Sequence, residues 1–250
     1  MLAAKDLSVY DSGRFAACLL VLRRAIARSS AIGHEPIIVD FGCSSGRLDG
    51  IIRAFVPNTL IIGIDLNPHS LRLAHKTSID HVVLADVRRA PIKNSIADLA
   101  LCLEVIEHMP ETDAFGTLAS IGKMLKTNGF LLLSTPNRKS PTYITETIVH
   151  LASGQRYKGG DPTHVNIYSQ KEIIELLRVG GFDVISNLGY WILPLTFYWI
   201  NTAGSKRNSS KWLQRLLLYT MRLTNPILLK APSLGFVQIL LCTNSKCGQS

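Results

Sequence analysis

The chain has 250 residues, of which 47% are hydrophobic and 18% are charged. This composition supplies enough apolar side chains for one large core, so it excludes a disordered chain and a disulfide-stapled miniprotein. Lysine and arginine outnumber the acids by 27 to 18, which gives a formal net charge of +9. Such a balance favours an anionic partner, either nucleic acid or an acidic membrane.

The cysteines are five in number and lack the CxxC spacing of metal and redox sites. Their apolar surroundings indicate buried thiols in a reducing compartment. No basic leader precedes the first apolar run at residues 15–22, which is also too short to span a bilayer. We therefore expect a cytoplasmic protein, with one membrane-facing segment described below.

Strands and helices alternate through the first half of the chain, after an N-terminal helix predicted over residues 14–30. The predicted strands are short apolar runs at residues 37–41, 60–64, 82–85, 97–103 and 130–134. The predicted helices carry apolar residues at helical spacing and cover residues 46–55, 68–76 and 113–125. Short connections between alternating elements indicate the α/β class with a doubly wound, mostly parallel sheet.

The second half of the chain is less regular. Residues 135–166 mix Pro, Gly, Ser and Tyr around a predicted helix at 143–151, and we interpret them as a lid. A helix at 168–177 and strands at 182–185 and 236–242 follow, with an insertion at 190–234. We expect residues 1–250 to form a single domain of this kind.

Four successive predicted strands carry an acid at or just past their C-terminal ends, namely Asp40, Asp65, Asp86 and Glu104. One such acid could cap a helix, but four of them at one edge indicate a binding site. In sheets of this kind, ligands bind outside the carboxyl ends of the strands.

The first strand runs into the stretch Val39-Asp40-Phe41-Gly42-Cys43-Ser44-Ser45-Gly46. It resembles the first motif of class I S-adenosylmethionine-dependent methyltransferases, an acid followed by GxGxG, with Ser44 in place of the middle glycine. A turn without side chains lets the backbone approach a ligand, and its N–H groups could face the methionine carboxylate. The resemblance assigns Asp40, Gly42, Cys43, Ser44 and Gly46 to cofactor binding.

Two later stretches are similar to the next motifs of the same family and separate it from nicotinamide-dependent Rossmann enzymes. Asp65, with Leu66 after it, falls where the family binds the cofactor ribose. Asp86 and Val87 fall where it binds the adenine edge. The resemblance implies a Rossmann-like sheet of seven strands with an antiparallel seventh strand, and S-adenosylmethionine as cofactor.

The stretch Glu104-Val105-Ile106-Glu107-His108 follows the fourth strand. Two carboxylates and an imidazole within one turn suit a divalent cation. The stretch is similar to one in ubiquinone-pathway O-methyltransferases and to one in small-RNA 3′-terminal 2′-O-methyltransferases, where it holds Mg²⁺ or a similar ion. In the alternative interpretation, Glu104 borders the methionine end and His108 caps or packs.

His164 lies in Asp161-Pro162-Thr163-His164, ahead of the helix at 168–177. The resemblance to the RNA enzymes makes it a further ligand of the metal site. From the residues alone, it could equally order the active-site loop or act as a general base. We therefore predict His108, His164 and Glu104 as catalytic, and Glu104, Glu107, His108 and His164 as metal ligands.

The insertion at 190–234 has six basic residues, no acid and all three tryptophans of the chain. Trp beside Lys and Arg, with long leucine runs, is typical of a helix at the inner face of an anionic membrane. A helix that caps the core or forms a dimer is the alternative interpretation, and RNA binding is a third.

Together these features predict O-methylation of a hydroxyl on a small or lipophilic, membrane-borne acceptor. An RNA 2′-O-methyltransferase and a non-catalytic cofactor-binding partner subunit are the rival hypotheses. We expect nucleic acid to be the less favoured partner, because the leucine-rich runs suit hydrocarbon better than bases.

Overall fold

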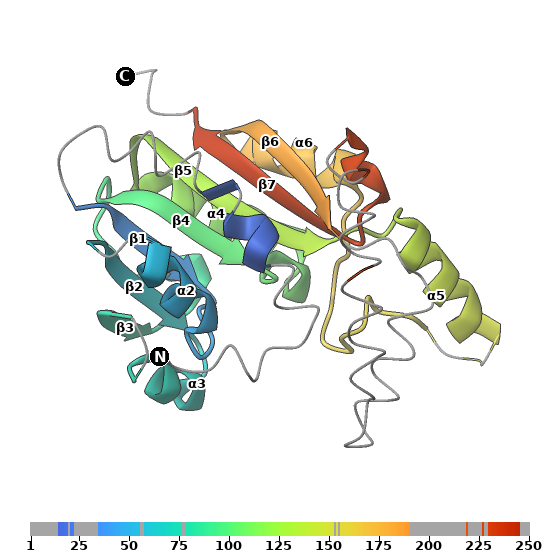
Figure 1. Ribbon diagram of the computed structural model, residues 1–250, viewed down its shortest axis with the longest axis horizontal. Helices are drawn as coiled ribbons and strands as arrows, with labels where there is room; N and C mark the ends of the chain where they lie inside the picture. The colour runs from blue at the N-terminus through green and yellow to red at the C-terminus, as the bar shows by residue number, and fades with distance from the viewer. Residues whose placement is uncertain are drawn as a thin grey trace.

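The computed structural model describes residues 15–19, 21–22, 35–55, 58–76, 79–152, 154, 156–190, 219, 227 and 230–245. Within them, one sheet has the strand order β3-β2-β1-β4-β5-β7-β6 (Figure 1). The strands are β1 Ile37–Phe41, β2 Leu60–Asp65, β3 His81–Leu84, β4 Ala97–Leu103, β5 Leu125–Pro136, β6 Phe182–Tyr190 and β7 Val237–Asn244. Strands β1 to β5 are parallel to one another, whereas β7 is antiparallel to its neighbours β5 and β6. The predicted fold class is confirmed.

Helices follow the strands in the predicted order. They are α2 Arg47–Phe55, α3 Pro68–Ala74, α4 Glu111–Met124, α5 Pro141–Ala152 and α6 Gln170–Gly180, with short 3-10 turns η2 Val87–Arg89, η3 Ile106–His108 and η4 Pro232–Leu234. The ends of α6 show why the sequence folds this way. Ser169 and Glu172 form a reciprocal capping box at its start, and Gly181 adopts a left-handed φ of 91° just past its end.

Alternate side chains of the strands fill two cores, one on each face of the sheet. Ile38 of β1 packs with Leu48 and Ile52 of α2, and the described part of the N-terminal helix adds Phe15, Cys18 and Leu22. Its neighbour Val39 packs on the other face with α4 and α6. The sheet is therefore the middle of three layers (Figure 1).

Two strands are longer than predicted. Strand β5 begins at Leu125, which pairs with Ala97, and a register shift before Phe130 absorbs the Asn128-Gly129 pair that we expected to form a turn. Strand β6 continues to Tyr190 because its whole length pairs with β7. The polar residues within it therefore do not end the strand.

The insertion starts one residue later than predicted, because Tyr190 is the buried last residue of β6. Its far end returns to the same place: a Cβ on Gly235 would lie 2.5 Å from the Cα of Gly189. Residues 191–218 and most of 220–229 lie outside the described residues, as does the rest of the predicted helix at 14–30. None of the helices in the described part of the chain has the length and hydropathy that crossing a bilayer requires.

Candidate functional site

The turn after β1 is built by backbone hydrogen bonds to β2. The N–H groups of Gly42 and Cys43 both donate to the carbonyl of Ile64, at 2.8 and 3.1 Å, and Ser44 donates to Asp65. These N–H groups, which we expected to face a ligand, therefore hold the turn against β2. What the turn offers a ligand is its close backbone approach.

Left-handed backbone explains the glycine pattern of this turn. Gly42 and Gly46 have φ values of 76° and 71°, and Ser44 has a φ of 49°. Ser44 thus adopts a conformation that favours glycine, which accounts for the glycine in the family pattern at this position. At Gly42 a Cβ would lie 2.6 Å from a methyl group of Val105, so this glycine also lets the turn meet the loop after β4.

Asp65 ends β2 with both carboxylate oxygens at the rim of this turn. Oδ2 accepts from the Ser44 N–H at 2.9 Å and Oδ1 from the Asn67 N–H at 2.8 Å. Each oxygen keeps a second lone pair for a ligand hydroxyl. The next residue, Leu66, is 64% exposed, so an apolar side chain stands open to a ligand beside the carboxylate.

Asp86 lies at the predicted edge, but its carboxylate has an internal partner. It caps η2 by accepting from the Arg88 N–H at 2.9 Å, and it forms an ion pair with the Arg88 guanidinium. Arg88 also reaches Asp113 at 2.6 Å. The hydrogen bond from Arg88 lowers the pKa of Asp86, so the carboxylate is ionised, and any ligand would have to share this carboxylate with Arg88. Val87 beside it is buried.

Beneath the turn lies a pair of buried carboxyls, Asp40 of β1 and Asp49 of α2. Burial, and then the charge of the neighbouring Asp49, raise the pKa of Asp40 well above its ordinary value. Burial likewise raises the pKa of Asp49, to about 6. Sequence reasoning missed Asp49, although an acid between Leu48 and Ile52, both on the core side of the helix, was a signal. The Cys43 thiol is also buried, which raises its pKa, and packs over Gly63.

Glu104, predicted for cofactor, metal and catalysis alike, is held by the end of β5. Its backbone is left-handed, with φ 57°, and its N–H donates to the Ser134 carbonyl. The Ser134 hydroxyl donates in turn to Glu104 Oε1 at 2.7 Å. Among the described residues, Glu104 is not part of the group formed by the other three predicted ligands.

That group consists of Glu107, His108 and His164, whose ligand atoms all lie within 4.8 Å of one another. Two loops are joined to make it: the N–H groups of Val165 and Asn166 both donate to the carbonyl of Glu107, at 2.8 and 3.0 Å. The structure thus brings together residues that are 56 positions apart in the chain, as the sequence predicted for the histidines. We name these three residues the Glu-His-His cluster.

Two members of the Glu-His-His cluster, Glu107 and His164, have supporting partners. Thr135 donates to Glu107 Oε2 at 3.1 Å, and His164 Nδ1 contacts the Lys158 carbonyl at 2.6 Å. A carbonyl only accepts, so Nδ1 carries the hydrogen and the Nε2 lone pair of His164 stays available. Burial lowers the pKa of His164, and the adjacent His108, 4.7 Å away between ring centroids, lowers it further. His164 is therefore neutral near pH 7.

The donor set decides which cation these residues fit. Two imidazoles and one carboxylate suit a transition metal such as Zn²⁺ or Fe²⁺, whereas Mg²⁺ prefers a shell of oxygens. With Glu104 bound to Ser134, the described residues supply one carboxylate to the cluster, so the predicted Mg²⁺ fits it less well.

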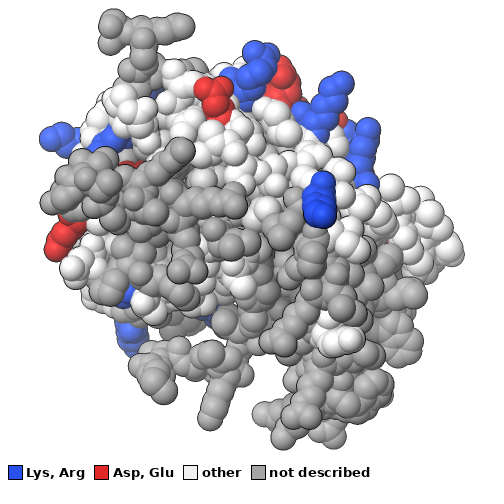
Figure 2. Space-filling view, turned by 45° about the horizontal axis from the view of Figure 1, so that its top comes forward, with Lys and Arg blue, Asp and Glu red and all other residues white. Residues whose placement is uncertain are grey.

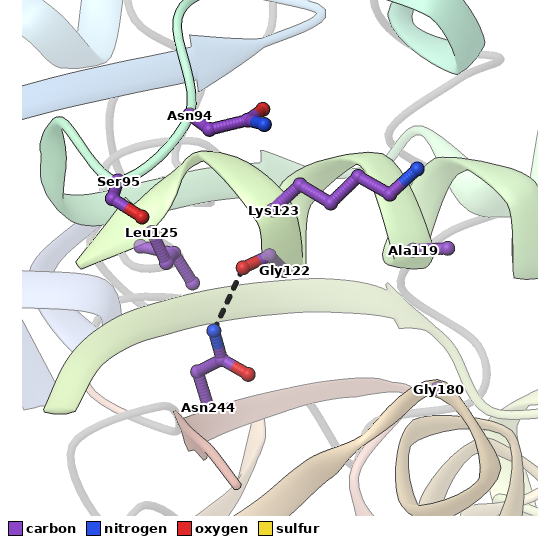
Figure 3. A pocket seen from close by; sticks show the side chains of 8 residues that line it. All are labelled: Asn94, Ser95, Ala119, Gly122, Lys123, Leu125, Gly180 and Asn244. Carbon is purple, nitrogen blue, oxygen red and sulfur yellow. Dashed lines mark hydrogen bonds between the residues drawn. The ribbon is translucent and has the colours of Figure 1, made fainter. Parts of the chain in front are cut away.

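A pocket of about 290 Å³ lies elsewhere, at the other edge of the sheet (Figure 3). It is bounded by the start of β4, the end of α4 and the end of β7, where Asn244 donates to the Gly122 carbonyl at 2.7 Å. Because the predicted cofactor residues follow the carboxyl ends of the strands, this pocket is not part of the candidate site.

Comparisons with known proteins identify the family of this chain. A family model described as a methyltransferase domain matches residues 10–187. The ubiquinone biosynthesis O-methyltransferase of Bordetella pertussis is 27% identical over 177 residues, which is 68% of this chain and 72% of the relative.

Two solved structures share the fold. Magnesium protoporphyrin IX methyltransferase from Synechocystis PCC 6803, with bound SAH, is 14% identical and has a TM-score of 0.60, with 98% of this chain and 90% of that one covered. The [4+2]-cyclase SpnF is 15% identical and has a TM-score of 0.62, with 97% and 84% covered. At these identities the likeness shows the fold alone, and one of the two carries a different reaction in its name.

Proposed function

This chain belongs to the methyltransferase domain family, and we propose that it transfers the methyl group of S-adenosylmethionine to a hydroxyl oxygen of a lipophilic acceptor. The observation that carries the proposal is the Glu-His-His cluster, in which Glu107 and His108 follow β4 at the carboxyl edge of the sheet and His164 joins them from the segment before α6. A hydroxyl is a poor nucleophile until its proton is removed, and these residues are suited to removing it.

The residues around the turn after β1 fit the proposed methyl donor, whose sulfonium supplies an activated methyl group. Gly42 lets the turn lie against the loop after β4, where a Cβ would lie 2.6 Å from a methyl group of Val105. Asp65 offers two oxygens for ribose hydroxyls, and the exposed Leu66 offers an apolar contact for the adenine. In this proposal Asp86 and Val87 line the far side of the adenine.

Two ways of activating the acceptor hydroxyl are compatible with the Glu-His-His cluster. A divalent cation held there would lower the pKa of the hydroxyl and orient it. Alternatively, the neutral His164 accepts the proton directly on Nε2. Removal of metal distinguishes the two ways of activation. If dialysis against a chelator abolishes turnover, and Zn²⁺, Fe²⁺ or Mn²⁺ restores it, activation by a bound cation is supported. Unchanged turnover assigns the proton to His164.

The exposed face of α5 supports a lipophilic acceptor. Its outward side chains are all aliphatic, whereas Thr142 and Glu146 on the inward side are buried. The outward residues are Ile144, Ile148, Val149, Leu151 and Ala152, of which Ile148 is 63% exposed. We name them the α5 apolar face. An exposed face of this kind is unusual on a soluble helix, whose polar residues normally face water.

Basic residues lie shortly before and after α5 in the chain, which favours an anionic lipid surface as the occupant of the α5 apolar face. Lys139 precedes the helix, and Arg156 and Lys158 follow it, all exposed. In Figure 2 the described surface at the far right, the side on which Figure 1 draws α5, is white and carries no charged side chain. An exposed aliphatic helix face with basic residues near the helix ends in the sequence is typical of interfacial helices.

The proposal is tested with methyl-labelled S-adenosylmethionine and a cell extract, separated afterwards into lipid, RNA and protein. Label in the organic phase is expected. Label in RNA would contradict the lipophilic acceptor and support RNA 2′-O-methylation.

Membrane docking is tested separately by sedimentation with vesicles that contain anionic lipid. Ile148→Glu in the α5 apolar face should release the protein from vesicles. Val179→Glu, at an equally aliphatic and 49% exposed position on α6, is the matched control and should not.

A further inference from the structure

His108 is the end of a hydrogen-bonded chain that runs through Thr163 to Asp161. Its Nδ1 atom lies 2.9 Å from Thr163 Oγ1, and Thr163 Oγ1 donates to Asp161 Oδ1 at 2.6 Å. The backbone N–H of Thr163 also donates to the same carboxylate oxygen, at 2.8 Å. Thr163 is thus fixed by Asp161 at both its backbone and its side chain.

The direction of each hydrogen bond follows from the protons available. The hydrogen bonds from Thr163 hold the pKa of Asp161 below its usual value, so its carboxylate is ionised and only accepts. The single hydroxyl proton of Thr163 therefore points to Asp161. The contact between Thr163 Oγ1 and His108 then needs a proton from the imidazole, so Nδ1 of His108 carries the hydrogen.

We propose that Asp161 and Thr163 are positioning residues, which hold His108 in the Nδ1-protonated tautomer and so keep its Nε2 lone pair for the acceptor hydroxyl or a cation. The inference rests on the proposed function of the Glu-His-His cluster for its purpose, but the tautomer is a property of the chain itself. Neither residue touches the reacting atoms in this account.

The loop that contains Asp161 and Thr163 also fixes the imidazole of His164 through its Nδ1 atom. His164 donates its Nδ1–H to the carbonyl of Lys158, and Lys158 Nζ donates to the carbonyl of Pro162 at 3.0 Å. Gly159 and Gly160 have left-handed φ values of 71° and 87°, which turn the chain between these contacts. Residues 158–164 therefore hold both imidazoles through hydrogen bonds at Nδ1 and leave each Nε2 lone pair for a ligand.

This arrangement has a clear chemical consequence. A neutral imidazole without such a partner exchanges between two tautomers, and only one of them leaves Nε2 free to accept a proton or bind a metal. Partners that orient metal-binding histidines typically contribute 10–100-fold to metal affinity. We expect the same order of effect from Thr163 on cation binding at the cluster.

The experiment reads the tautomer directly, by long-range ¹H–¹⁵N correlation on protein labelled with ¹⁵N in its histidines, with His108→Gln to assign the signals. The spectra are recorded at about pH 8.5, where an ordinary imidazole is neutral. In the wild type, His108 is expected as the Nδ1-protonated tautomer. Thr163→Val, which keeps the shape without the hydroxyl, is expected to give a mixture, and Thr163→Ser is expected to restore the wild-type signal.

Two further measurements keep structural loss apart from loss of positioning. Thr147→Val removes a hydroxyl that donates only to the Tyr143 carbonyl on α5, and it should leave the His108 signal unchanged. Titration with Zn²⁺ should show binding weakened by about 10-fold or more in Thr163→Val but not in Thr147→Val.

An Nε2-protonated His108 in the wild type, or identical histidine spectra for Thr163→Val and Thr163→Ser, would overturn the inference. No acceptor or methyl donor is present in these spectra. A failure of the proposed reaction would therefore leave their result intact, and the two failures are distinguishable.

Discussion

The backbone N–H of Ser44 donates to Asp65 Oδ2 at 2.9 Å, which ties the turn after β1 to the end of β2. The residue proposed to bind the ribose therefore also holds the turn proposed to receive the methionine end. Changes at either position should affect cofactor affinity, although for different reasons.

Asp65→Ala should weaken binding of S-adenosylmethionine by about 100-fold or more, because two hydrogen bonds to a charged group are lost and the turn is released. Isothermal titration with the cofactor measures this. Asp65→Asn is the matched variant, since it keeps one acceptor oxygen, and it should lose less affinity. Retained tight binding in Asp65→Ala would rule out the assignment of Asp65 to the cofactor.

Ser44→Gly should stabilise the protein by up to about 1 kcal/mol, because the left-handed φ of 49° no longer opposes a side chain. Chemical unfolding measures the free energy. Ser45→Gly makes the same chemical change at the adjacent position, where φ is not positive. It should destabilise the protein, because glycine increases the conformational entropy of the unfolded chain. Equal effects of the two substitutions would contradict the role given to the turn geometry.

The buried pair Asp40 and Asp49 predicts how stability depends on pH. Both pKa values are raised in the folded state, so the folded protein binds protons more tightly than the unfolded chain does. This contribution to stability is present at low pH and is lost as the pH rises from about 4 through about 6 and beyond.

Asp49→Asn should remove the part of that dependence that comes from Asp49 and stabilise the cofactor-free protein at pH 7 by an amount on the order of 1–3 kcal/mol, whereas burial keeps the pKa of Asp40 raised. Asp80 supplies an opposite control. Burial alone would raise its pKa, but hydrogen bonds from Ile61 and Arg53 outweigh burial and lower it. Asp80→Asn should therefore destabilise the protein at pH 7. A destabilised Asp49→Asn would contradict a raised pKa of Asp49 that is caused by burial.

Two glycines in the region predicted as a lid, at 135–166, allow a matched test of the Glu-His-His cluster. Gly154 and Gly159 share a φ of 71°, so alanine strains the backbone equally at both. At Gly154 the new Cβ would meet open space, but at Gly159 it would lie 2.7 Å from Ile167 and 3.0 Å from His164 Nδ1.

Gly159→Ala should therefore reduce methyl transfer at least about 10-fold more than Gly154→Ala does, with similar cofactor affinity in both. Steady-state rates and cofactor titrations compare them. Similar rates in the two variants would contradict a role of His164 in methyl transfer. The opening and closing of residues 135–166 as a lid stays a prediction.

Much of the fold could be predicted because its signals are local. Short apolar runs gave the strands, and an acid followed by a glycine turn gave the edge where the site lies. Strand pairing depends on residues far apart in the chain, which is why β5 and β6 extend beyond the apolar runs from which they were predicted. The boundaries of the insertion shifted for the same reason.

The site was predictable in part. The ExxEH spacing and His164 predicted the Glu-His-His cluster, but spacing did not show that Glu104 turns to Ser134 instead. Asp49, Thr163 and Asp161 were missed as site residues, because burial and side-chain partners depend on tertiary contacts. From the sequence alone, the outward aliphatic side chains of α5 would be predicted to pack in the core. Hydrophobic periodicity identifies an apolar helix face but not whether that face is buried.

The most direct test of the account compares methyl transfer by the wild type and by His164→Gln, both saturated with labelled S-adenosylmethionine. Because His164 is placed at the acceptor and not at the cofactor, we expect unchanged cofactor affinity and a loss of label transfer of about 100-fold or more. Transfer at the wild-type rate, with cofactor still bound, would contradict the claim that the Glu-His-His cluster activates the acceptor.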